Sequence, residues 1–457
     1  MPLILPGNVG SATAATGFNV ANSVNCGDTS TRFTGSAKVT STSQQKGSWN
    51  IWLKRTVLGE QGLFKVYESA NTGVEFKFDS SDQFLMREFE SGSDVFNLKT
   101  SAAFRDTSAW MNILLAIDTT QGTEANRIRL YINGVEPSLA TSTRPSVNTN
   151  LVRFFANGSD SSGQQHEMGN NYDGATGHYL LTQILYVDGT QLANTDVGEF
   201  DSDSGIWKPI DISGTTLGNN GYYLSMEDSS DFGTATGKSF TAHGFAATDS
   251  RIDTCTNNFA TLNPLIFESS SNTFAEGNLK ITGGGSDSWT THYGLSTIAV
   301  STGKWFVESK VTTVQDAQAI LGLISTSEAI GSSLKDEGVL AVEKSGRITG
   351  GGNNLQTGLT AFSNGDIAGL AFDATNGTGQ FYRNGSAYGS AVSSLASDTY
   401  YFATTTYESG GVIEFNFGSP PYSESGGNSD GDGFGNFSMA VPSGYFALNT
   451  KNLAEYG

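Results

Sequence analysis

The stretch AIDTTQGTEANRIRLYINGVEP, residues 116–137, is echoed by AFDATNGTGQFYRNGSAYG, residues 371–389. Each begins with an apolar run that ends in an aspartate, Asp118 or Asp373, and continues through a Thr/Gly-rich turn into a second run. That second run ends in Tyr-x-Asn-Gly in both copies. Asn-Gly between alternating apolar segments is a strong hairpin signal, because both residues tolerate the positive φ of a tight turn. The echo therefore predicts two β-domains of related architecture, each with a strand–turn–strand–turn–strand meander.

Alternating apolar residues predict strands along most of the remaining chain. In the segment WNIWLKR, Trp49 and Leu53 fall on one face, whereas Trp52 faces either solvent or a second layer. Helical periodicity is nearly absent, and the best helix candidate is the short segment Asp196–Phe200. Closely spaced strands with turns between them indicate an all-β fold of two tandem β-sandwich domains. The predicted strands are Ser48–Arg55, Gly62–Tyr67, Gly73–Phe78, Phe84–Phe89, Met111–Asp118, Ile128–Ile132, Arg153–Phe155 and Tyr179–Val187 in the first domain, and Leu295–Val300, Lys304–Thr312, Ala319–Leu323, Gly338–Val342, Asp366–Phe372, Gly379–Tyr382, Tyr400–Thr406 and Val412–Phe417 in the second.

The composition supports a folded, turn-rich β-protein. The 457 residues include 56 Gly, 28 Phe, 16 Tyr and 6 Trp, and only 15% are charged. Disordered chains are poor in aromatic residues, so the bulk of the chain is predicted to fold. A formal net charge of −20 makes nucleic acid and anionic membranes unfavourable partners. No apolar run approaches the roughly 18 residues of a transmembrane helix, and the N-terminal sequence lacks the pattern of a signal peptide.

Composition shifts along the chain predict its domain boundaries. Residues 1–20 form an apolar, Pro-containing segment that is too short for a domain and is predicted to be an extended anchor. The first β-domain covers residues 21–245. The stretch 246–264 is polar, rich in Thr and Asn and ends in Asn-Pro, so it is predicted to be a linker. The second β-domain covers residues 265–457.

The motifs of the first domain resemble those of a known structural family. They include the strand WNIWLKRTVLG, the turn LYING, and the segments VGEFDSDSGIWKP (residues 197–209) and GNNGYYLSMEDSSDFGTATGKSF (residues 218–240). In this order they resemble the laminin-G/pentraxin-type, concanavalin-like jelly rolls of tailed-phage virion proteins, especially marine ones. The resemblance implies a concanavalin-like jelly roll for the first domain.

The second domain resembles a SPRY-type sandwich as those phage proteins carry it. The segments concerned are STIAVSTGKWFVESKV (residues 296–311), FYRNG, IEFNFGSPPY (residues 413–422) and PSGYFALNTKNL (residues 442–453). One departure lies in the linker motif, where Cys255 stands in place of the expected proline. The other is that the chain ends at NLAEYG, which favours a two-domain accessory protein over a long fibre.

Together the resemblances imply a phage virion accessory protein, attached to the head or tail as a fibre or decoration protein and adhering to a host surface or its glycans. Two alternatives stay open: a purely architectural decoration protein without a ligand, and a virion-borne polysaccharide depolymerase. The implied partners are other virion proteins, further copies of the chain in a homo-oligomer such as a trimer, and a host surface glycan. Nucleic acid and membrane partners are not expected.

No catalytic set is recognisable, so the chain is expected not to be an enzyme. Glycoside hydrolysis needs two carboxylates that flank a sugar, but no paired E-x-D-x-E strand of the laminarinase type is present. The four histidines share no metal-ligand spacing such as HExxH, and a structural role is predicted for each. They are His166, His178, His243 and His292.

Acidic turns are the candidate metal sites. Asp201 and Asp203 lie in one Asp/Ser/Gly cluster, and Asp430 and Asp432 in another. Calcium prefers carboxylate and carbonyl oxygens, which such loops supply, although Asp/Gly clusters are also commonly plain turns. Calcium is the only cofactor that the sequence suggests.

A polar loop is the candidate glycan site, since sugar-binding sandwiches place an aromatic ring beside Asn and Asp side chains. Its residues are Asn170, Asn171, Tyr172 and Asp173.

The N-terminal apolar run is the candidate anchor. Leu3, Ile4 and Leu5 lie between two prolines and are hypothesised to dock on a virion partner as an extended segment that adds to a sheet edge. The alternative is that they cover the first domain's own sheet. The two cysteines, Cys26 and Cys255, are either two free thiols, the favoured interpretation, or one disulfide between the ends of the first domain.

Overall fold

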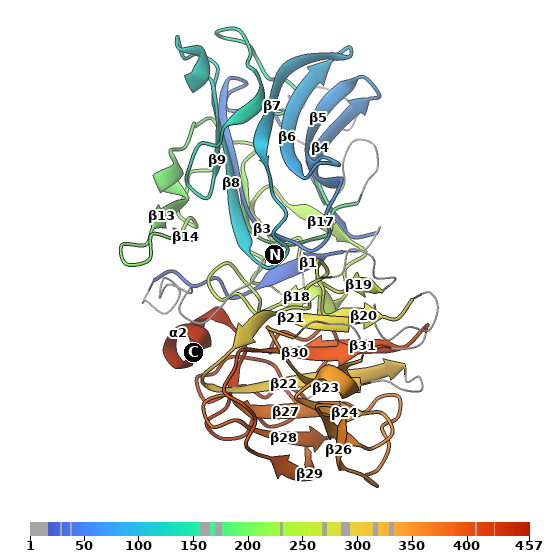
Figure 1. Ribbon diagram of the computed structural model, residues 1–457. Coiled ribbons are helices and arrows are strands. Elements are labelled where there is room, and N and C mark those ends of the chain that lie inside the picture. Colours follow the sequence, from blue (N-terminus) through green and yellow to red (C-terminus); the bar gives the residue numbers. More distant parts are fainter. Residues whose placement is uncertain are drawn as a thin grey trace. The chain divides into compact units, whose positions relative to one another are not determined.

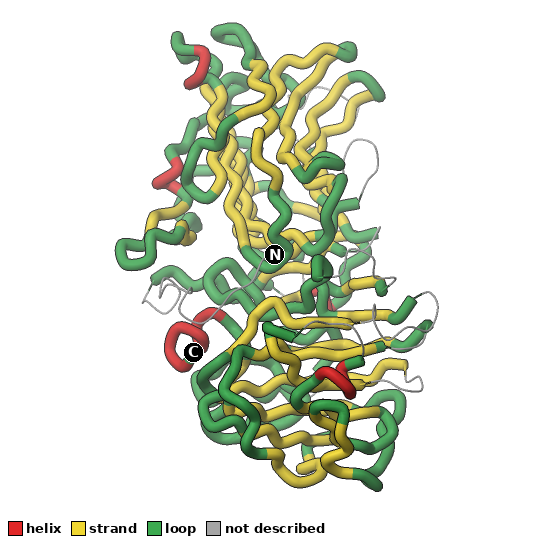
Figure 2. The backbone as a smooth tube through the Cα atoms, in the orientation of Figure 1, coloured by secondary structure: helices red, strands yellow, loops and turns green. Residues whose placement is uncertain are grey.

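The structure is a computed structural model that describes residues 17–27, 30–36, 39–155, 165–169, 176–228, 232–266, 272–284, 293–313, 319–328, 333–406, 409–424 and 426–457. Strands dominate these residues, and helices are confined to short turns (Figure 2). The chain divides into an N-terminal unit, Thr16–Thr256, and a C-terminal unit whose described part begins at Asn257. None of the helices described is long and apolar enough to span a membrane. The predicted all-β fold of two tandem sandwiches is confirmed.

The N-terminal unit consists of two antiparallel sheets (Figure 1). The first sheet follows the order β16 (Thr236–Gly237), β15 (Tyr222–Leu224), β12 (Tyr179–Asp188), β3 (Lys46–Arg55), β8 (Trp110–Asp118), β9 (Ile128–Ile132), with β1 (Ser23–Cys26) beside β12 and β18 (Ser250–Arg251) beside β1. The second follows β10 (Leu139–Thr143), β7 (Ser93–Ala103), β6 (Gln83–Glu90), β5 (Thr72–Phe78), β4 (Gln61–Ser69), β11 (Glu167–Met168), β2 (Arg32–Gly35), β17 (Phe240–His243). A separate hairpin joins β13 (Gly198–Phe200) to β14 (Trp207–Pro209).

Alternation along β3 fills two apolar layers. Trp49 and Leu53 lie in the core between the sheets, where the Trp49 ring contacts Phe64 and Phe76 with centroids 5.5 and 5.1 Å away. Trp52 points the other way and is only 3% exposed, in a smaller cluster that includes Trp207. Of the two orientations open for Trp52, the second layer is therefore the one adopted.

The C-terminal unit repeats the two-sheet plan. One sheet follows β19 (Thr273–Ala275), β20 (Lys280–Thr282), β31 (Val412–Asn416), β22 (Lys304–Thr313), β27 (Ile367–Asp373), β28 (Thr378–Arg383), β29 (Ser386–Val392), with β32 (Phe446–Ala447) parallel to β22. The other follows β21 (Tyr293–Val300), β30 (Tyr400–Thr405), β23 (Ala319–Ser325), β24 (Leu340–Glu343), β25 (Ile348–Gly350), β26 (Asn353–Gln356). The helices are α1 (Leu334–Glu337) and α2 (Thr450–Tyr456).

The repeated motif forms the same turn in both units. Asn133 and Asn384 have φ of +48° and +50°, and the glycine after each also has positive φ. The Asn133 side-chain oxygen accepts the N–H of Asn112 over 2.7 Å, and that of Asn384 accepts the N–H of Ile367 over 2.8 Å. The asparagine thus closes the turn with its side chain as well as its backbone, which explains why this residue recurs.

The aspartates of the motif also occupy equivalent places. Asp118 ends β8 opposite Lys46, and Asp373 ends β27 opposite Lys304, with the lysine Nζ 3.2 and 3.4 Å from the carboxylate. The strand after the Asn-Gly turn differs between the units. In the C-terminal unit it is β29 of the same sheet, but in the N-terminal unit only an isolated bridge at Val135 follows, and β10 joins the other sheet. The prediction of a third meander strand is therefore wrong for the first copy.

Two local predictions are also wrong. Residues 153–155, expected as a strand, form a turn, because the N–H groups of Arg153 and Phe154 bond to the buried carboxylate of Glu88 over 3.3 and 3.1 Å. The expected helix Asp196–Phe200 begins at the end of a 3-10 turn, Asn194–Asp196, and continues as β13.

The boundary between the units falls at residues 256 and 257, inside the expected linker 246–264. The part of that stretch before the boundary is packed into the N-terminal unit. There Asp253 is 2% exposed and forms a buried ion pair with Lys54, whose Nζ lies 2.8 Å from Asp253 Oδ2. Asp253 Oδ1 accepts the indole N–H of Trp110 over 2.9 Å. Cys26 and Cys255 are both free thiols.

Candidate functional site

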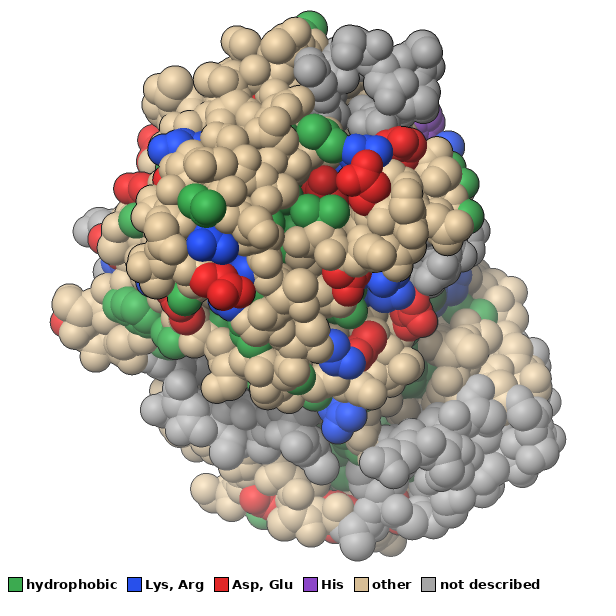
Figure 3. Space-filling model, turned by 90° about the horizontal axis from the view of Figure 1, so that it is seen from above, with side chains coloured by type: hydrophobic (Ala, Val, Ile, Leu, Met, Phe, Trp, Pro, Cys, Tyr) green, Lys and Arg blue, Asp and Glu red, His purple; other side chains and the backbone are tan. Residues whose placement is uncertain are grey.

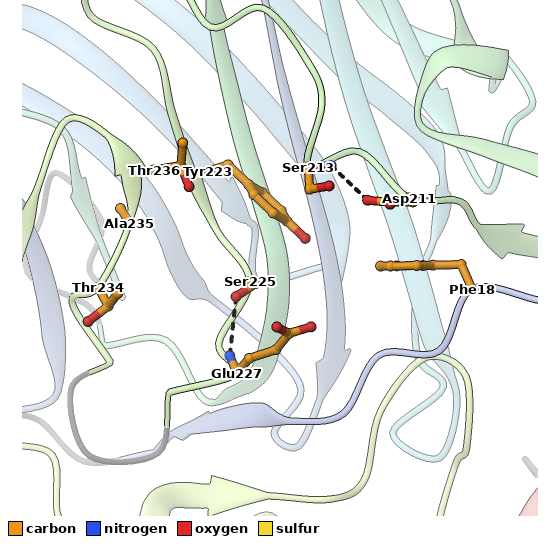
Figure 4. A pocket seen from close by; sticks show the side chains of 9 residues that line it. All are labelled: Phe18, Asp211, Ser213, Tyr223, Ser225, Glu227, Thr234, Ala235 and Thr236. Atoms are coloured by element: carbon orange, nitrogen blue, oxygen red, sulfur yellow. Dashed lines mark hydrogen bonds between the residues drawn. The ribbon is translucent and has the colours of Figure 1, made fainter.

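A pocket of about 430 Å³ opens on the outer side of the first sheet of the N-terminal unit (Figure 4). This volume lies within the range of about 300–1,000 Å³ that is usual for small-molecule sites. The lining combines two aromatic rings, two carboxylates and the hydroxyl groups of four Ser and Thr side chains. The residues are Phe18, Asp211, Ser213, Tyr223, Ser225, Glu227, Thr234, Ala235 and Thr236.

Strand β15 sets the inner wall. Tyr222 and Leu224 point into the main core, where the Tyr222 hydroxyl lies 3.1 Å from Nδ1 of His166. Because successive strand residues face opposite sides, Tyr223 between them points outward into the pocket. His166 therefore has a structural role, as predicted.

A bulge in β12 fixes the Tyr223 ring. The strand register shifts between Thr182 and Leu185, and Gln183 within the bulge has φ of +51°. Such bulges re-aim side chains. Here the Gln183 Oε1 accepts the Tyr223 hydroxyl over 2.5 Å. Burial raises the pKa of Tyr223, and the nearby charges of Glu227 and Asp211 raise it further, so this phenol stays neutral.

The segment after β14 supplies one of the carboxylates. Ile212 is 3% exposed and anchors the segment in the outer apolar layer, which leaves its neighbours Asp211 and Ser213 on the surface. Asp211 Oδ1 accepts the N–H of Ser213 over 2.9 Å. Hydrogen bonds from Ser213 lower the pKa of Asp211, which therefore carries its negative charge at neutral pH.

Glu227 supplies the other carboxylate. Its backbone is fixed because its N–H donates to Ser225 Oγ over 3.3 Å and its carbonyl accepts from Asn22 Nδ2 over 3.2 Å. Within the described residues, its side chain has neither a hydrogen-bond nor an ion-pair partner in the protein. Figure 4 shows the Glu227 carboxylate, the Tyr223 hydroxyl and the edge of the Phe18 ring all directed toward the middle of the pocket.

Phe18 closes the pocket from a distant part of the sequence. It is half-buried and comes from the segment that leads into β1. That segment is held at Val20, whose N–H bonds to Thr256 Oγ1 over 3.0 Å. The opposite side is formed by Thr234–Thr236, and Thr236 belongs to β16, paired with β15.

The predicted metal residues Asp201 and Asp203 shape the β13–β14 turn. Asp201 Oδ1 accepts the N–H of Asp203 and both the N–H and hydroxyl of Ser204, at 3.2, 2.9 and 2.9 Å. These hydrogen bonds lower the pKa of Asp201 to about 2. Lys208 completes the set, with its Nζ 3.3 Å from Asp201 Oδ2.

The predicted metal residue Asp430 organises the C-terminal loops. Its Oδ1 accepts the N–H groups of Asp432 and Phe434 at 3.0 and 2.9 Å. Its Oδ2 accepts the N–H of Ala447 and the amide of Asn452 at 3.0 and 2.8 Å. Asp432 accepts the hydroxyl of Tyr456 over 2.8 Å.

Protein donors thus already occupy the oxygens that a cation would need at Asp430, and the same holds for Asp201. Nowhere in the described ranges do three His, Cys, Asp or Glu side chains cluster as a metal site would require. The calcium site stays a prediction without a matching geometry. The predicted glycan loop, Asn170–Asp173, and the predicted anchor, Leu3–Leu5, lie outside the described residues.

In the view of Figure 3 many of the charged side chains lie next to a side chain of opposite sign, and most of the surface around them is uncharged. Ion pairs of the N-terminal unit such as Arg87–Asp94 and Arg153–Glu90, at 3.9 and 3.2 Å, follow the same arrangement. The described part of this face carries no continuous basic patch of the kind that binds nucleic acid.

Comparison with known proteins finds a family model that matches part of the N-terminal unit. Residues 27–176, about a third of the chain, match a family model described as the concanavalin A-like lectin/glucanases superfamily. This confirms the concanavalin-like fold expected for the first domain over those residues. A search of the curated proteins found no match.

Solved structures that match include SPRY domains and a pentraxin. The SPRY domain of human HERC1 is 17% identical, with 34% of this chain and 96% of that chain covered and a TM-score of 0.28. The PSpry domain of TRIM65 is 13% identical, with 35% and 92% covered and a TM-score of 0.28. The heptameric SAP-like pentraxin of Limulus polyphemus is 10% identical, with 39% and 80% covered and a TM-score of 0.27. Likeness at this level carries no information about ligands.

The sequence did not reveal this pocket, although one signal was present. Six of the nine lining residues, from Tyr223 to Thr236, fall in the segment GNNGYYLSMEDSSDFGTATGKSF that carries the family resemblance. Which of two adjacent tyrosines faces outward depends on the pairing of β15 with β12, which is not visible in the sequence. Phe18 is more than 190 residues away from the other lining residues, roughly the length of a domain.

Proposed function

We propose that this chain is a virion accessory protein whose N-terminal unit binds a glycan on the host surface, in the pocket between Phe18 and Tyr223. The observation that carries the proposal is the pocket itself. Aromatic rings offer the flat apolar surface on which a sugar ring stacks, and carboxylates and hydroxyls beside them bond the sugar hydroxyls. The concanavalin-like match supports a glycan ligand for this unit in general, since its description names lectins and glucanases, but it covers residues 27–176 and none of the residues that line the pocket.

Binding without hydrolysis is the form of the proposal that the carboxylates favour. A glycosidase needs one carboxylic acid that is protonated near neutral pH, and hence has a raised pKa, beside a second carboxylate. Hydrogen bonds from Ser213 instead lower the pKa of Asp211. Asp211 therefore does not suit the role of the proton donor that the depolymerase alternative requires.

Location in the virion rests on the motif resemblance and needs its own test. Deletion of residues 1–10, which removes Leu3, Ile4 and Leu5, should leave circular dichroism and melting unchanged but abolish incorporation into particles, as measured by mass spectrometry of purified virions. Normal incorporation of the truncated chain would refute anchoring by this segment. Incorporation with no glycan binding by the intact chain would favour the architectural alternative.

The ligand proposal is tested with the purified full-length chain on an array of host surface polysaccharides. Phe18→Ala should weaken binding up to about tenfold, because a stacked aromatic contributes about 0.5–1.5 kcal/mol. Phe200→Ala is the matched control, since Phe200 is a 50% exposed ring on β13 outside the pocket. Equal loss in both variants, or no binding to any glycan, would contradict the proposal. Release of reducing ends from the same polysaccharides would establish the depolymerase instead.

A further inference from the structure

The charge of the pocket is as distinctive as its shape. Of its nine lining residues two are carboxylates, Asp211 and Glu227, and none is Lys, Arg or His. We propose that the ligand carries a positive charge, and that it is a sugar bearing a free, protonated amino group. This inference rests on the proposed function, which it narrows to one class of glycan.

Glu227 is the group best placed to receive the ammonium. Its backbone is held on both sides by Ser225 and Asn22, whereas its carboxylate, directed into the pocket, has no protein partner among the described residues. Hydrogen bonds to an ionised carboxylate are roughly twice as strong as those between neutral groups, and both oxygens of Glu227 are open to such a bond. The ammonium therefore has an acceptor in the pocket that no described protein group occupies.

Asp211 adds a second negative charge from another segment. One of its oxygens, Oδ1, accepts the N–H of Ser213, and this hydrogen bonding keeps the group ionised. A cation in the pocket is attracted by both carboxylates, whereas a uronic or sialic acid would be repelled by both. The pocket thus selects against acidic sugars.

The aromatic rings fit the same ligand. Phe18 and Tyr223 present apolar surface beside the carboxylates, so a sugar ring can stack while its amino group reaches the acidic side. Tyr223 cannot compete with the ligand for the carboxylates, because its hydroxyl already donates to Gln183.

The test compares three sugars of one ring type that differ in charge: glucosamine, N-acetylglucosamine and glucuronate. Binding to the full-length chain is measured by calorimetry at pH 6, in low salt and again in 0.5 M NaCl. We expect glucosamine to bind at least tenfold more tightly than the other two, and its affinity to fall with salt. Glu227→Gln should lower the affinity for glucosamine about tenfold, equivalent to about 1.4 kcal/mol, and change the affinity for N-acetylglucosamine less than twofold.

Glu124→Gln is the matched control. Glu124 is exposed in the 3-10 turn before β9, at the opposite end of the sheet order from β15. Its substitution removes the same charge as Glu227→Gln but does not change the pocket. Its affinity for glucosamine should stay at the wild-type value. Equal weakening by Glu124→Gln and Glu227→Gln would mean that net charge, not the pocket, attracts the ligand, and would overturn the inference.

The remaining outcomes separate this inference from the proposed function. If N-acetylglucosamine binds as tightly as glucosamine and Glu227→Gln has no effect, glycan binding stands and charge selection is wrong. If cyclohexylamine binds as tightly as glucosamine, charge selection stands and the glycan proposal fails. If none of the sugars binds and cyclohexylamine does not bind either, both are wrong.

Discussion

The two Asn-Gly turns have the same backbone but different surroundings, and this difference predicts unequal responses to the same mutation. A Cβ added at Gly134 would lie 2.3 Å from Cε3 of Trp207, whereas one at Gly385 would meet nothing within 4 Å. Both glycines have positive φ, +74° and +84°. An alanine at either position therefore suffers backbone strain, but only at Gly134 does it also collide with a neighbour.

The collision at Gly134 has no easy relief. Trp207 is 6% exposed, and its indole N–H donates to Asn112 over 3.1 Å. The backbone of Gly198 touches the ring as well, since a Cβ there would lie 2.5 Å from Trp207 Cε2. The ring therefore cannot move away from Gly134 without losing its hydrogen bond or its place in the outer apolar layer.

The magnitudes follow from these two terms. Left-handed strain costs about 1–2 kcal/mol for a non-glycine residue, and overpacking a buried site costs about 1–3 kcal/mol more. Replacing glycine by alanine also lowers the conformational entropy of the unfolded chain, which stabilises both variants by about 0.4–1 kcal/mol. Gly134→Ala should thus destabilise the N-terminal unit by about 1–3 kcal/mol more than Gly385→Ala destabilises the C-terminal unit, which is several degrees in melting temperature.

Hydrogen exchange followed by mass spectrometry is the suitable assay, because peptides report on each unit separately within the intact chain. Protection should fall in β8 and β9 for Gly134→Ala, and to a smaller extent in β27 and β28 for Gly385→Ala. Equal losses at the two turns would show that contact with Trp207 does not matter. A loss of glycan binding with unchanged protection would refute the structural role given to the turns.

Three further predictions concern buried polar groups. Asp253→Asn should destabilise the N-terminal unit by about 3–5 kcal/mol in chemical denaturation, because it leaves the fully buried Lys54 without its carboxylate; a Lys54→Met/Asp253→Asn double variant that is no more stable than the single one would contradict this explanation. Burial raises the pKa of Glu308 to about 7, from an unfolded value near 4.5, so the folded state binds the proton more tightly than the unfolded state. The free energy of unfolding should therefore fall as the pH rises from about 4.5 to about 7, by about 3 kcal/mol at most. Glu308→Gln should remove that slope from the melting profile of the C-terminal unit, and a slope equal to that of the wild-type chain would show that another group causes it. Asp430→Asn should cost about 1–3 kcal/mol equally with calcium and with EDTA, because four protein donors lose a charged acceptor; a stabilisation by calcium that disappears in this variant would restore the predicted metal site.

Much of the fold was predictable because it is encoded locally. The Asn-Gly turns and the alternation of Trp49 and Trp52 need only nearest neighbours in the sequence, and both predictions match the structure. Strand β7 is absent from the predicted strands because its sequence, SDVFNLKTSAA, is largely polar. Its extended conformation depends on backbone pairing with β6 and β10, which the sequence pattern does not show. Residues 153–155 were misassigned because the partner of their N–H groups, Glu88, is distant in the sequence.

The candidate site was less predictable than the fold for a related reason. The expected sites were runs of adjacent polar residues, since these are what a sequence displays. Asp201 and Asp430 do lie in such runs, but their oxygens bond to their own loops. In the pocket, by contrast, Phe18 and Glu227 lie close together because strands pair and because a hydrogen bond at Val20 holds the segment before β1 in place.

The chain enters and leaves the N-terminal unit at neighbouring strands. Ser23 of β1 lies opposite Arg251 of β18, and Val20 bonds to Thr256 just beyond. A unit with adjacent ends can be inserted into a surface loop of another protein, or cut elsewhere and rejoined by a short bridge, without moving its sheets. In recombination between genes this unit would behave as a transferable cassette, provided that the exchanged block extends through residue 256 and so carries Asp253 along with Lys54.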